Sequence, residues 1–243
     1  MRQFHFTVDY KKYVADLLRQ HDIDTAMALA VGGNYEATGI LHTELLAMAG
    51  MKGGDYLIDV GCGSGRTAAC LSRRTNIRYL GIDVVEDLIK YAIRKNPKHY
   101  RFAVADGLKI PEQNNTADFV TFFSVLTHLL HEESFQYLEE AARVLKPGGK
   151  VIASFLEFHI PSHWAVFAAT VANSKADLPR PLNVFLDRNA IESFATHLGF
   201  TVASFLDGDK PTIPLRQDIV YDNGKRESGM GTFGQSVVIL QKN

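Results

Sequence analysis

Short apolar runs alternate with amphipathic segments through the middle of the chain. The apolar runs have the length of strands, and the segments between them repeat their apolar residues at helical spacing. Five strands are predicted here, at residues 56–60, 78–82, 100–104, 118–123 and 150–155. Helices are predicted at residues 66–75, 86–95 and 132–145, and in the second of them one apolar face carries Leu88, Ile89, Ala92 and Ile93. This alternation indicates a parallel sheet with helices on both faces.

The pattern changes toward the end of the chain. A helix is predicted at residues 191–198, followed by strands at 200–206 and 236–240. No helix separates these two strands, and a parallel crossover would normally need one, so we expect them to pair antiparallel. The connection between them, residues 207–235, is rich in Gly and Pro. A connection of this length in a compact domain is more often functional than idle.

These patterns predict one main domain with additions. Residues 1–50 look helical and are expected to form an N-terminal cap. Residues 51–243 are expected to form an α/β domain with a Rossmann-like, doubly wound sheet that is mostly parallel, with an antiparallel last strand and helices on both faces. Insertions at 156–186 and 207–235 interrupt this domain. Ligands of open α/β sheets bind at the carboxyl ends of the strands, where the cap and the insertions would cover them.

Composition and charge narrow the kinds of partner. The chain has 243 residues, of which 46% are hydrophobic and 22% are charged, as in ordinary globular proteins. Lys and Arg total 26 against 27 Asp and Glu, a net charge of −1. The basic excess usual in nucleic-acid-binding proteins is therefore missing. We expect no nucleic-acid partner, and a small or neutral substrate.

Cysteine content and hydropathy favour a cytoplasmic protein. Cys62 and Cys70 are too few for a disulfide framework and are interpreted as reduced thiols. The N-terminal residues carry charges throughout and lack the apolar centre of a signal peptide. The longest stretch without Asp, Glu, Lys or Arg, from Phe158 to Ser174, is too short and too polar to span a membrane. We expect no membrane partner, and no pattern in the sequence indicates an oligomeric state.

A glycine-rich turn joins the first predicted strand to the first helix. Residues 57–66 read Leu-Ile-Asp-Val-Gly-Cys-Gly-Ser-Gly-Arg. Glycines there allow positive φ angles and a close approach of a ligand, and the helix N-terminus supplies free N–H groups. A P-loop would need GxxxxGK[ST], which is absent. A nicotinamide site would need a small residue where Arg66 stands. The remaining alternative is a site for S-adenosylmethionine.

Two carboxylates at strand ends strengthen that alternative. Asp83 follows Gly61 by 22 residues and can accept hydrogen bonds from two ribose hydroxyls. Asp106, at the end of the third strand, can accept from the exocyclic amine of adenine. The segment 143–149, Arg-Val-Leu-Lys-Pro-Gly-Gly, leads into the fifth strand. In the order and spacing of these motifs, residues 55–155 resemble the class I S-adenosylmethionine-dependent methyltransferases. The antiparallel last strand also resembles the seventh strand of that family.

The resemblance implies residues for the methionine half of the cofactor. Asp59 would order the loop and reach the methionine ammonium, directly or through water. Ser124, at the end of the fourth strand, would approach the sulfonium. The loop residues implied to line the methionine are Gly61, Cys62, Gly63 and Gly65. A purely structural role as a loop cap stays open for Asp59, and Cys62 is expected to have no redox or nucleophilic role.

The resemblance also implies residues for the adenosine half. Asp83 would hold the ribose, and Val84 would pack on the adenine. Asp106 and Gly107 would meet the edge of the adenine. Simpler alternatives remain open, because Asp83 could be an ordinary helix cap and Asp106-Gly107 a common turn.

The catalytic step needs alignment and, for a hydroxyl acceptor, a base. S-adenosylmethionine supplies an activated methyl group, so the protein has to position the acceptor in line with it. Histidine is the usual base for a phenol or an alcohol. His128, after the fourth strand, is the first candidate and His159, after the fifth, is the second. Glu157 is an alternative base, and a structural role stays open for each histidine. No metal is predicted.

Two aromatic residues outside the repeating pattern are candidates for contact with the substrate. Tyr35 lies in the glycine-containing segment 31–40. This segment could form a flap over the cofactor, or only a turn between two helices. Trp164 could form an apolar lid together with Phe158 and Phe167, or these rings could be core packing. An apolar lid would suit an aromatic or lipid-like acceptor.

The sequence therefore predicts an enzyme that moves a methyl group from S-adenosylmethionine to a small-molecule acceptor, with a hydroxyl oxygen as the attacking atom, by in-line displacement. S-adenosylhomocysteine would be the product of the cofactor. The alternatives are N- or C-methylation of a small metabolite, or a binding module without catalysis. No Asn/Asp-Pro-Pro-Tyr/Phe signature follows the fourth strand, where residues 124–127 read Ser-Val-Leu-Thr. This argues against nucleic-acid or protein amide nitrogen as acceptor.

Overall fold

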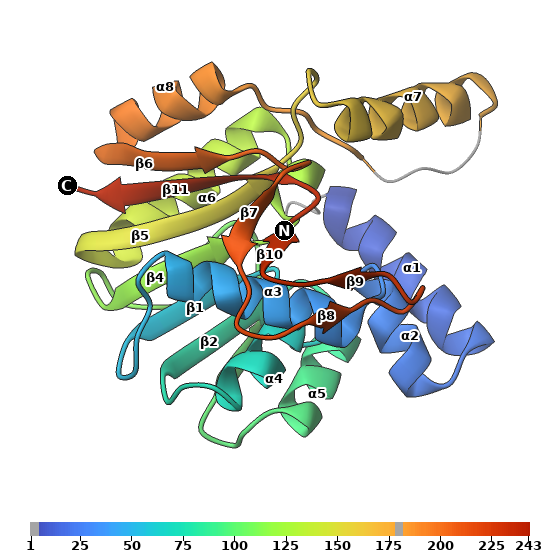
Figure 1. Ribbon diagram of the computed structural model, residues 1–243, viewed down its shortest axis with the longest axis horizontal. Coiled ribbons are helices and arrows are strands. Elements are labelled where there is room, and N and C mark those ends of the chain that lie inside the picture. The colour runs from blue at the N-terminus through green and yellow to red at the C-terminus, as the bar shows by residue number, and fades with distance from the viewer. Residues whose placement is uncertain (1–4, 178–181) are drawn as a thin grey trace. The chain divides into compact units, whose positions relative to one another are not determined.

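The computed structural model describes residues 5–177 and 182–243 (Figure 1). Seven strands form a sheet in the order β3-β2-β1-β4-β5-β11-β6. β1 pairs parallel with β2, β2 with β3, and β4 with β5, whereas β11 pairs antiparallel with both β5 and β6. The predicted α/β fold, mostly parallel with an antiparallel last strand, is confirmed.

The chain divides into two compact units. The first comprises residues up to 107 together with 213–231, and the second comprises residues 108–212 together with 232–243. The predicted helical segment 1–50 therefore belongs to the same compact unit as the first three strands.

The first unit contains three parallel strands and five helices. The strands are β1 (Tyr56–Val60), β2 (Arg78–Asp83) and β3 (Arg101–Val104). The helices are α1 (His5–Gln20), α2 (Ile23–Ala30), α3 (Tyr35–Met48), α4 (Arg66–Ser72) and α5 (Glu86–Lys95). β1 and α5 have the predicted bounds, whereas α4 ends three residues before the predicted end at 75. The short strands β8 (Ile219–Val220) and β9 (Arg226–Glu227) complete this unit.

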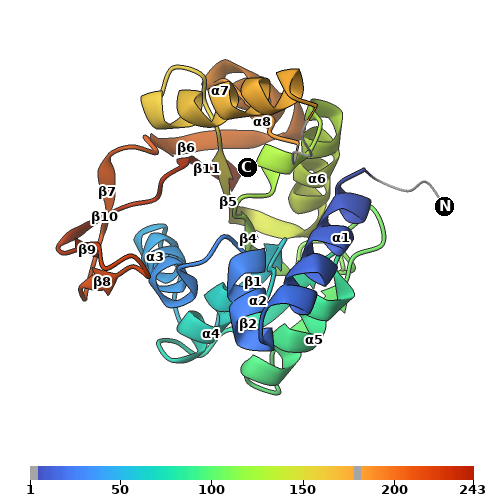
Figure 2. The same ribbon diagram turned by 90° about the vertical axis from the view of Figure 1, so that its right-hand side faces the viewer.

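The N-terminal helices pack on α5 (Figure 2). Asp22 caps α2 by accepting hydrogen bonds from the N–H groups of Asp24 and Thr25. A buried cluster then joins Val14 of α1, Met27 of α2 and Leu88 of α5, with Ala30, Val85 and Tyr91. Burial of this much apolar surface holds α1 and α2 against α5.

One predicted core residue of α5 is not in the core. Ile93 is 55% exposed, whereas Tyr91, at a position not assigned to the apolar face, is buried. The hydroxyl of Tyr91 reaches Asp24 of α2 at 2.9 Å, so packing of the N-terminal helices turns that side of α5 inward.

The second unit contains the other four strands of the sheet. They are β4 (Ala117–Phe122), β5 (Leu145–Phe155), β6 (Phe200–Leu206) and β11 (Ser236–Lys242). Its helices are η1 (Leu126–His128), α6 (His131–Val144), α7 (Pro161–Lys175) and α8 (Arg188–Leu198), the last of which runs beside β6 (Figure 1). The predicted antiparallel pairing of the last two strands is confirmed, with Val237 opposite Leu206.

The long connection between β6 and β11 is not irregular. β7 (Pro211–Pro214) pairs with β10 (Met230–Thr232), and β8 pairs with β9. None of the helices in the described residues is long and apolar enough to cross a membrane.

Candidate cofactor and acceptor site

The glycine turn after β1 is held by backbone hydrogen bonds to β2. The N–H groups of Gly61 and Cys62 both donate to the carbonyl of Ile82, at 2.7 and 3.0 Å. Gly65 then begins α4 with a φ of 82°. A Cβ atom on Gly65 would lie 2.6 Å from the side-chain nitrogen of Asn96, so both its φ angle and its close packing require glycine.

The carboxylate of Asp83 fastens the glycine turn to the start of the next helix. Its Oδ2 accepts the N–H of Gly63 at 2.9 Å, and its Oδ1 accepts the N–H of Val85 at 2.9 Å. Burial raises the pKa of Asp83, and hydrogen bonds from the backbone N–H groups of Val85, Gly63 and Val84 oppose that effect. A carboxylate offers about four lone-pair positions, so these backbone contacts leave capacity for a further hydrogen bond from a ligand.

Asp59 lies buried in β1, directly before this turn. Its Oδ2 accepts the hydroxyl proton of Tyr79 at 2.7 Å. Its negative charge also acts on Arg66, since burial lowers the pKa of that guanidinium and Asp59 raises it. Asp59 is therefore fixed in place before any ligand binds.

The N-terminal helices contact the glycine turn directly. Arg66 donates to the carbonyls of Val31 and Gly33, at 2.6 and 3.4 Å. Ser64 donates to the carbonyl of Met27 at 3.0 Å, and the hydroxyl of Tyr35 donates to the carbonyl of Ser64 at 3.1 Å. The glycines of residues 32–33 form the turn between α2 and α3, and Tyr35 is the first residue of α3.

Cys62 and Asp106 differ in their surroundings. Cys62 is buried, and burial raises the pKa of its thiol well above the ordinary value. It is therefore held as a thiol, which agrees with the prediction of no nucleophilic role. Asp106 is exposed, and Gly107 follows it at a φ of 82°. The residue before them, Ala105, donates its N–H to the carbonyl of Asp83 at 2.8 Å.

In the second unit, Ser124 has an unusual backbone. It is not a glycine, yet its φ is 58°. Its N–H donates to the hydroxyl oxygen of Ser154 at 2.7 Å, and its own hydroxyl reaches Gln235 Oε1 at 3.3 Å. Strained backbone of this kind persists where the surrounding contacts hold it, and it is typical of functional sites.

The ring of His128 has a defined orientation. Its Nδ1 lies 2.8 Å from the carbonyl oxygen of Leu182, which can only accept a hydrogen bond, so Nδ1 carries the proton. In the neutral ring Nε2 then has the basic lone pair. Burial lowers the pKa of His128, and the contact with Leu182 opposes this, so the neutral form persists below the ordinary pKa.

The other candidates after β5 lie in different environments. Glu157 is buried and paired with Arg188 through two hydrogen bonds of 2.9 and 3.1 Å. His159 is 65% exposed, and its Nδ1 lies 3.7 Å from Glu157. Trp164 is 51% exposed and packs on Phe167 with tilted rings, whose centroids are 5.1 Å apart.

α7 presents most of its side chains to solvent. His163 is the only buried residue of this helix, and the neighbouring Ala165, Ala168 and Ala169 are exposed. Phe158, Phe167 and Phe185 nevertheless pack on one another, with centroids 4.7 to 5.5 Å apart. These three rings therefore form a small aromatic cluster of their own, separate from the main hydrophobic core.

Residues 58–153 match the model of a methyltransferase domain. This segment of the chain therefore carries a methyltransferase domain and resembles the class I S-adenosylmethionine-dependent methyltransferases. The predicted resemblance is confirmed, and S-adenosylmethionine is the cofactor of this family.

Two curated methyltransferases show what kinds of protein share this domain. The chain is 30% identical over 124 residues to 27-O-demethylrifamycin SV methyltransferase of Amycolatopsis mediterranei, a match that covers 48% of this chain and 44% of that one. It is 34% identical over 119 residues to 2-phytyl-1,4-naphtoquinone methyltransferase of Nostoc punctiforme, covering 46% and 50%. The match therefore spans about half the length of these relatives.

The fold is shared over nearly the whole chain with a solved methyltransferase. Magnesium protoporphyrin IX methyltransferase from Synechocystis PCC 6803, with bound SAH, superposes with a TM-score of 0.64 at 15% identity. The superposition covers 98% of both chains. At this identity the likeness concerns the fold.

The surroundings of Asp83 are compatible with the adenosine half of the cofactor. Beside its backbone hydrogen bonds the carboxylate keeps capacity to accept from a ribose hydroxyl. Val84 is partly buried against the apolar cluster of the N-terminal helices. Tyr10 of α1 packs on the same cluster, and burial and then the charge of Asp83 raise the pKa of its hydroxyl.

Sequence reasoning missed Tyr10 and the contacts of Arg66. Tyr10 lies outside every recognised motif, in a helix whose packing partner the sequence does not reveal. The sequence did mark Arg66 as unusual, because a large charged residue stands at the sixth position of the glycine motif. That residue was interpreted only as an obstacle to a nicotinamide site. No group of three or more His, Cys, Asp or Glu suited to a metal occurs in residues 5–177 and 182–243.

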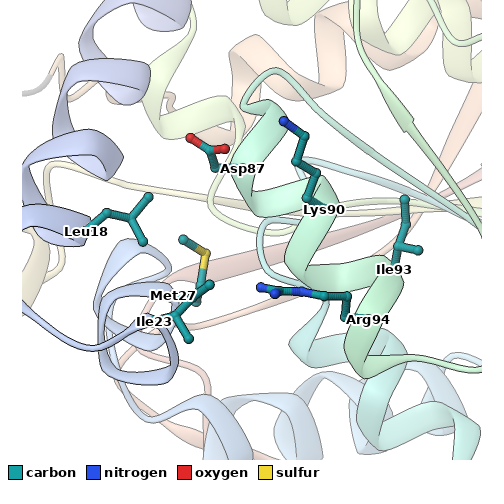
Figure 3. Close-up of a pocket in the computed structure, with 7 residues that line it drawn as sticks. All are labelled: Leu18, Ile23, Met27, Asp87, Lys90, Ile93 and Arg94. Atoms are coloured by element: carbon teal, nitrogen blue, oxygen red, sulfur yellow. The ribbon is translucent and has the colours of Figure 1, made fainter.

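A separate groove lies on the outer helices of the first unit (Figure 3). Its apolar lining comes from α1, α2 and α5, with charged residues of α5 at its edge. The lining residues are Leu18, Ile23, Met27, Asp87, Lys90, Ile93 and Arg94. None of the predicted site residues lines it, so this groove is distinct from the cofactor residues.

Proposed function

We propose that the chain transfers a methyl group from S-adenosylmethionine to a hydroxyl oxygen of a small molecule. The observation that carries the proposal is the carboxylate of Asp83, which already binds the glycine turn through Gly63 and the start of α5 through Val85. A cofactor whose ribose replaces water on the remaining lone pairs needs no rearrangement of these groups. Asp59, buried at the end of β1 and held by Tyr79, is proposed to order the turn that follows it.

His128 supports oxygen as the acceptor. The cofactor supplies an electrophilic methyl group when bound. An attacking hydroxyl forms the new O–C bond while the C–S bond breaks and its electron pair stays on sulfur. The acceptor then has a proton to lose, and His128 Nε2 is the basic nitrogen of a ring whose Nδ1 proton is held by Leu182. Its lowered pKa keeps it neutral and able to accept that proton at neutral pH.

The other candidates receive different roles. Glu157 is fully engaged with Arg188, so it supports the fold at this edge and does not act as a base. His159, exposed, ranks behind His128. Tyr35 is bound to the glycine turn and is proposed to border the methyl group. Trp164, on the exposed face of α7, is proposed to contact the acceptor.

The test is methyl transfer with labelled cofactor. The protein is incubated with S-adenosylmethionine labelled in its methyl group and with paired acceptors that differ only in hydroxyl, amine or activated carbon. Mass spectrometry of the product and measurement of S-adenosylhomocysteine follow. The proposal predicts labelled methyl ethers from hydroxyl acceptors. Transfer only to nitrogen or carbon would overturn the choice of oxygen, and binding of cofactor without turnover of any acceptor would favour a non-catalytic module.

A further inference from the structure

Three polar side chains of the second unit meet where β4 and β5 end. Ser124 follows β4, Ser154 lies near the end of β5, and Gln235 precedes β11. The Ser154 hydroxyl lies 2.7 Å from Gln235 Oε1 and 2.7 Å from the Ser124 nitrogen. The register agrees, since Val237 of β11 is opposite Ser154.

The direction of these bonds fixes the Gln235 amide. Ser154 Oγ accepts the N–H of Ser124, so its own proton is available for the carbonyl oxygen of Gln235. The hydroxyl of Ser124 donates to the same oxygen. The NH₂ group of Gln235 is therefore left with two donors, and no hydrogen-bond partner for it occurs in the described part of the chain. Gln235 is partly buried, so a ligand can reach this group.

The backbone on both sides of Gln235 is held firmly. Gly234 donates its N–H to the carbonyl of Gly208 at 2.9 Å, and its own carbonyl lies 3.2 Å from Nε2 of His163. Ser236 donates to the buried carboxylate of Glu157. Side chains that recognise a ligand are effective when supporting contacts fix them in this way. The Glu157–Arg188 ion pair and His163 have no part in the proposed methyl transfer. They support the residues on both sides of Gln235.

An aromatic pair adjoins the three polar residues along the chain. Phe123 precedes Ser124, and Phe233 lies two residues before Gln235. Their rings pack with centroids 5.6 Å apart. Phe123 is buried and supports the partly exposed ring of Phe233, on which a flat apolar ligand can pack. An NH₂ group can only donate to an oxygen or nitrogen that accepts.

We infer that Gln235 is a specificity-determining residue, whose NH₂ group donates to an accepting oxygen on a flat, apolar acceptor. This inference rests on the proposed function, because it names the class of acceptor. A site built to donate a hydrogen bond discriminates strongly against an analogue that lacks the accepting oxygen.

The test compares two probes that differ only in one methoxy substituent, whose ether oxygen can accept a hydrogen bond. Binding of 4-methoxy-1-naphthol and of 1-naphthol is measured in the presence of saturating S-adenosylhomocysteine. The wild-type protein should bind the methoxy compound at least ten-fold more tightly. Gln235→Glu keeps the oxygen that accepts from the serines and removes both N–H donors, so it should abolish this preference while changing the affinity for 1-naphthol less than three-fold.

Two controls separate this inference from the proposed function and from a folding defect. Gln241→Glu, on the exposed far end of β11, should behave as wild type. Affinity for S-adenosylhomocysteine should be the same in all three proteins, and its absence in the wild type would instead defeat the proposed function. Where this cofactor product binds, equal affinity for the two naphthols, no binding of either, or a preference that survives in Gln235→Glu would overturn the inference.

Discussion

Oδ2 of Asp83 accepts the backbone N–H of Gly63 at 2.9 Å, so the carboxylate proposed to hold the ribose also holds the glycine turn. The other oxygen accepts the N–H of Val85 at the start of α5. The two motifs recognised separately in the sequence are thus one structural unit. Their distance is set by the protein before a cofactor arrives, which lowers the ordering cost of binding.

Replacing Asp83 should weaken cofactor binding. Asp83→Ala removes the acceptor for the ribose and leaves Gly63 and Val85 without partners. Loss of such hydrogen bonds costs about 1–3 kcal/mol, or roughly a five- to 150-fold rise in Kd. Asp83→Asn retains one accepting oxygen and should lose less. Calorimetric titration with S-adenosylmethionine measures this, with Asp87→Ala, at an exposed position of α5, as control. Wild-type affinity in Asp83→Ala would argue against the ribose role.

His128 should govern turnover and not cofactor affinity. His128→Ala removes the basic nitrogen, and a general base contributes roughly 10²–10⁴-fold to rate. The substitution should therefore lower kcat by that order while the Kd for S-adenosylmethionine stays the same. His197→Ala, an exposed histidine of α8, is the matched control. Steady-state kinetics with a hydroxyl acceptor checks this, and unchanged kcat in His128→Ala would move the base elsewhere.

The pH dependence of the methyl-transfer rate gives a second test of the role of His128. Because burial lowers its pKa, the neutral form persists below the ordinary value of about 6.5. The rate should therefore begin to fall only below about pH 6.5. A rate that already falls between pH 8 and 7 would indicate a base with an unperturbed or raised pKa.

Arg66 should matter for stability. Arg66→Met keeps an apolar stem and removes the hydrogen bonds to the carbonyls of Val31 and Gly33. Two partly buried carbonyls then lose their partner, so the free energy of unfolding should fall by about 1–3 kcal/mol. Arg19→Met, whose arginine is exposed on α1, should change stability by less than about 1 kcal/mol. Urea denaturation compares the variants, and equal losses would show that the Arg66 contacts carry no special weight.

Acid should destabilise the fold through buried histidines. Burial lowers the pKa of His42 and of His163. The N–H of Glu157 also donates to Nδ1 of His163 at 3.0 Å, which requires a neutral ring. The unfolded chain protonates both near pH 6.5 and so binds more protons than the folded protein below that value. Stability should be level above about pH 6.5 and fall below it, by up to ~1.4 kcal/mol per pH unit for each histidine.

Denaturation at pH 7.5 and pH 5.5 measures that effect. His42→Gln should show a shallower loss between the two, since it removes one of the groups that titrates differently in the folded and unfolded states. Identical stability of the wild type at both pH values would contradict the inferred burial of neutral rings.

The alternating strands and helices could be predicted, because each of them follows a local pattern of apolar residues. β1 and α5 have the bounds read from the sequence, since apolar runs and helical spacing are local properties. Ile93 shows the limit of that rule. Its spacing placed it on the buried face, but the N-terminal helices cover Tyr91 instead. Which side of a helix is covered depends on segments distant in the sequence.

The candidate site divides in the same way. Asp83 and Gly63 lie in local motifs, so the sequence could name both. Gln235 lies 111 residues after Ser124, in a segment without a recognisable motif. Only the register of β11 on β5 brings the two together, and pairing between distant strands is not written in either segment alone. For the same reason the sequence could not distinguish buried, paired Glu157 from exposed His159.

We propose that the glycine turn and Asp83 form a site for S-adenosylmethionine. Calorimetric titration of the wild-type protein with S-adenosylmethionine, S-adenosylhomocysteine and NAD tests this site. We expect saturable binding of the first two at one site per chain, and no binding of NAD at the same concentrations. Absence of binding by S-adenosylmethionine, or tighter binding of NAD, would contradict it.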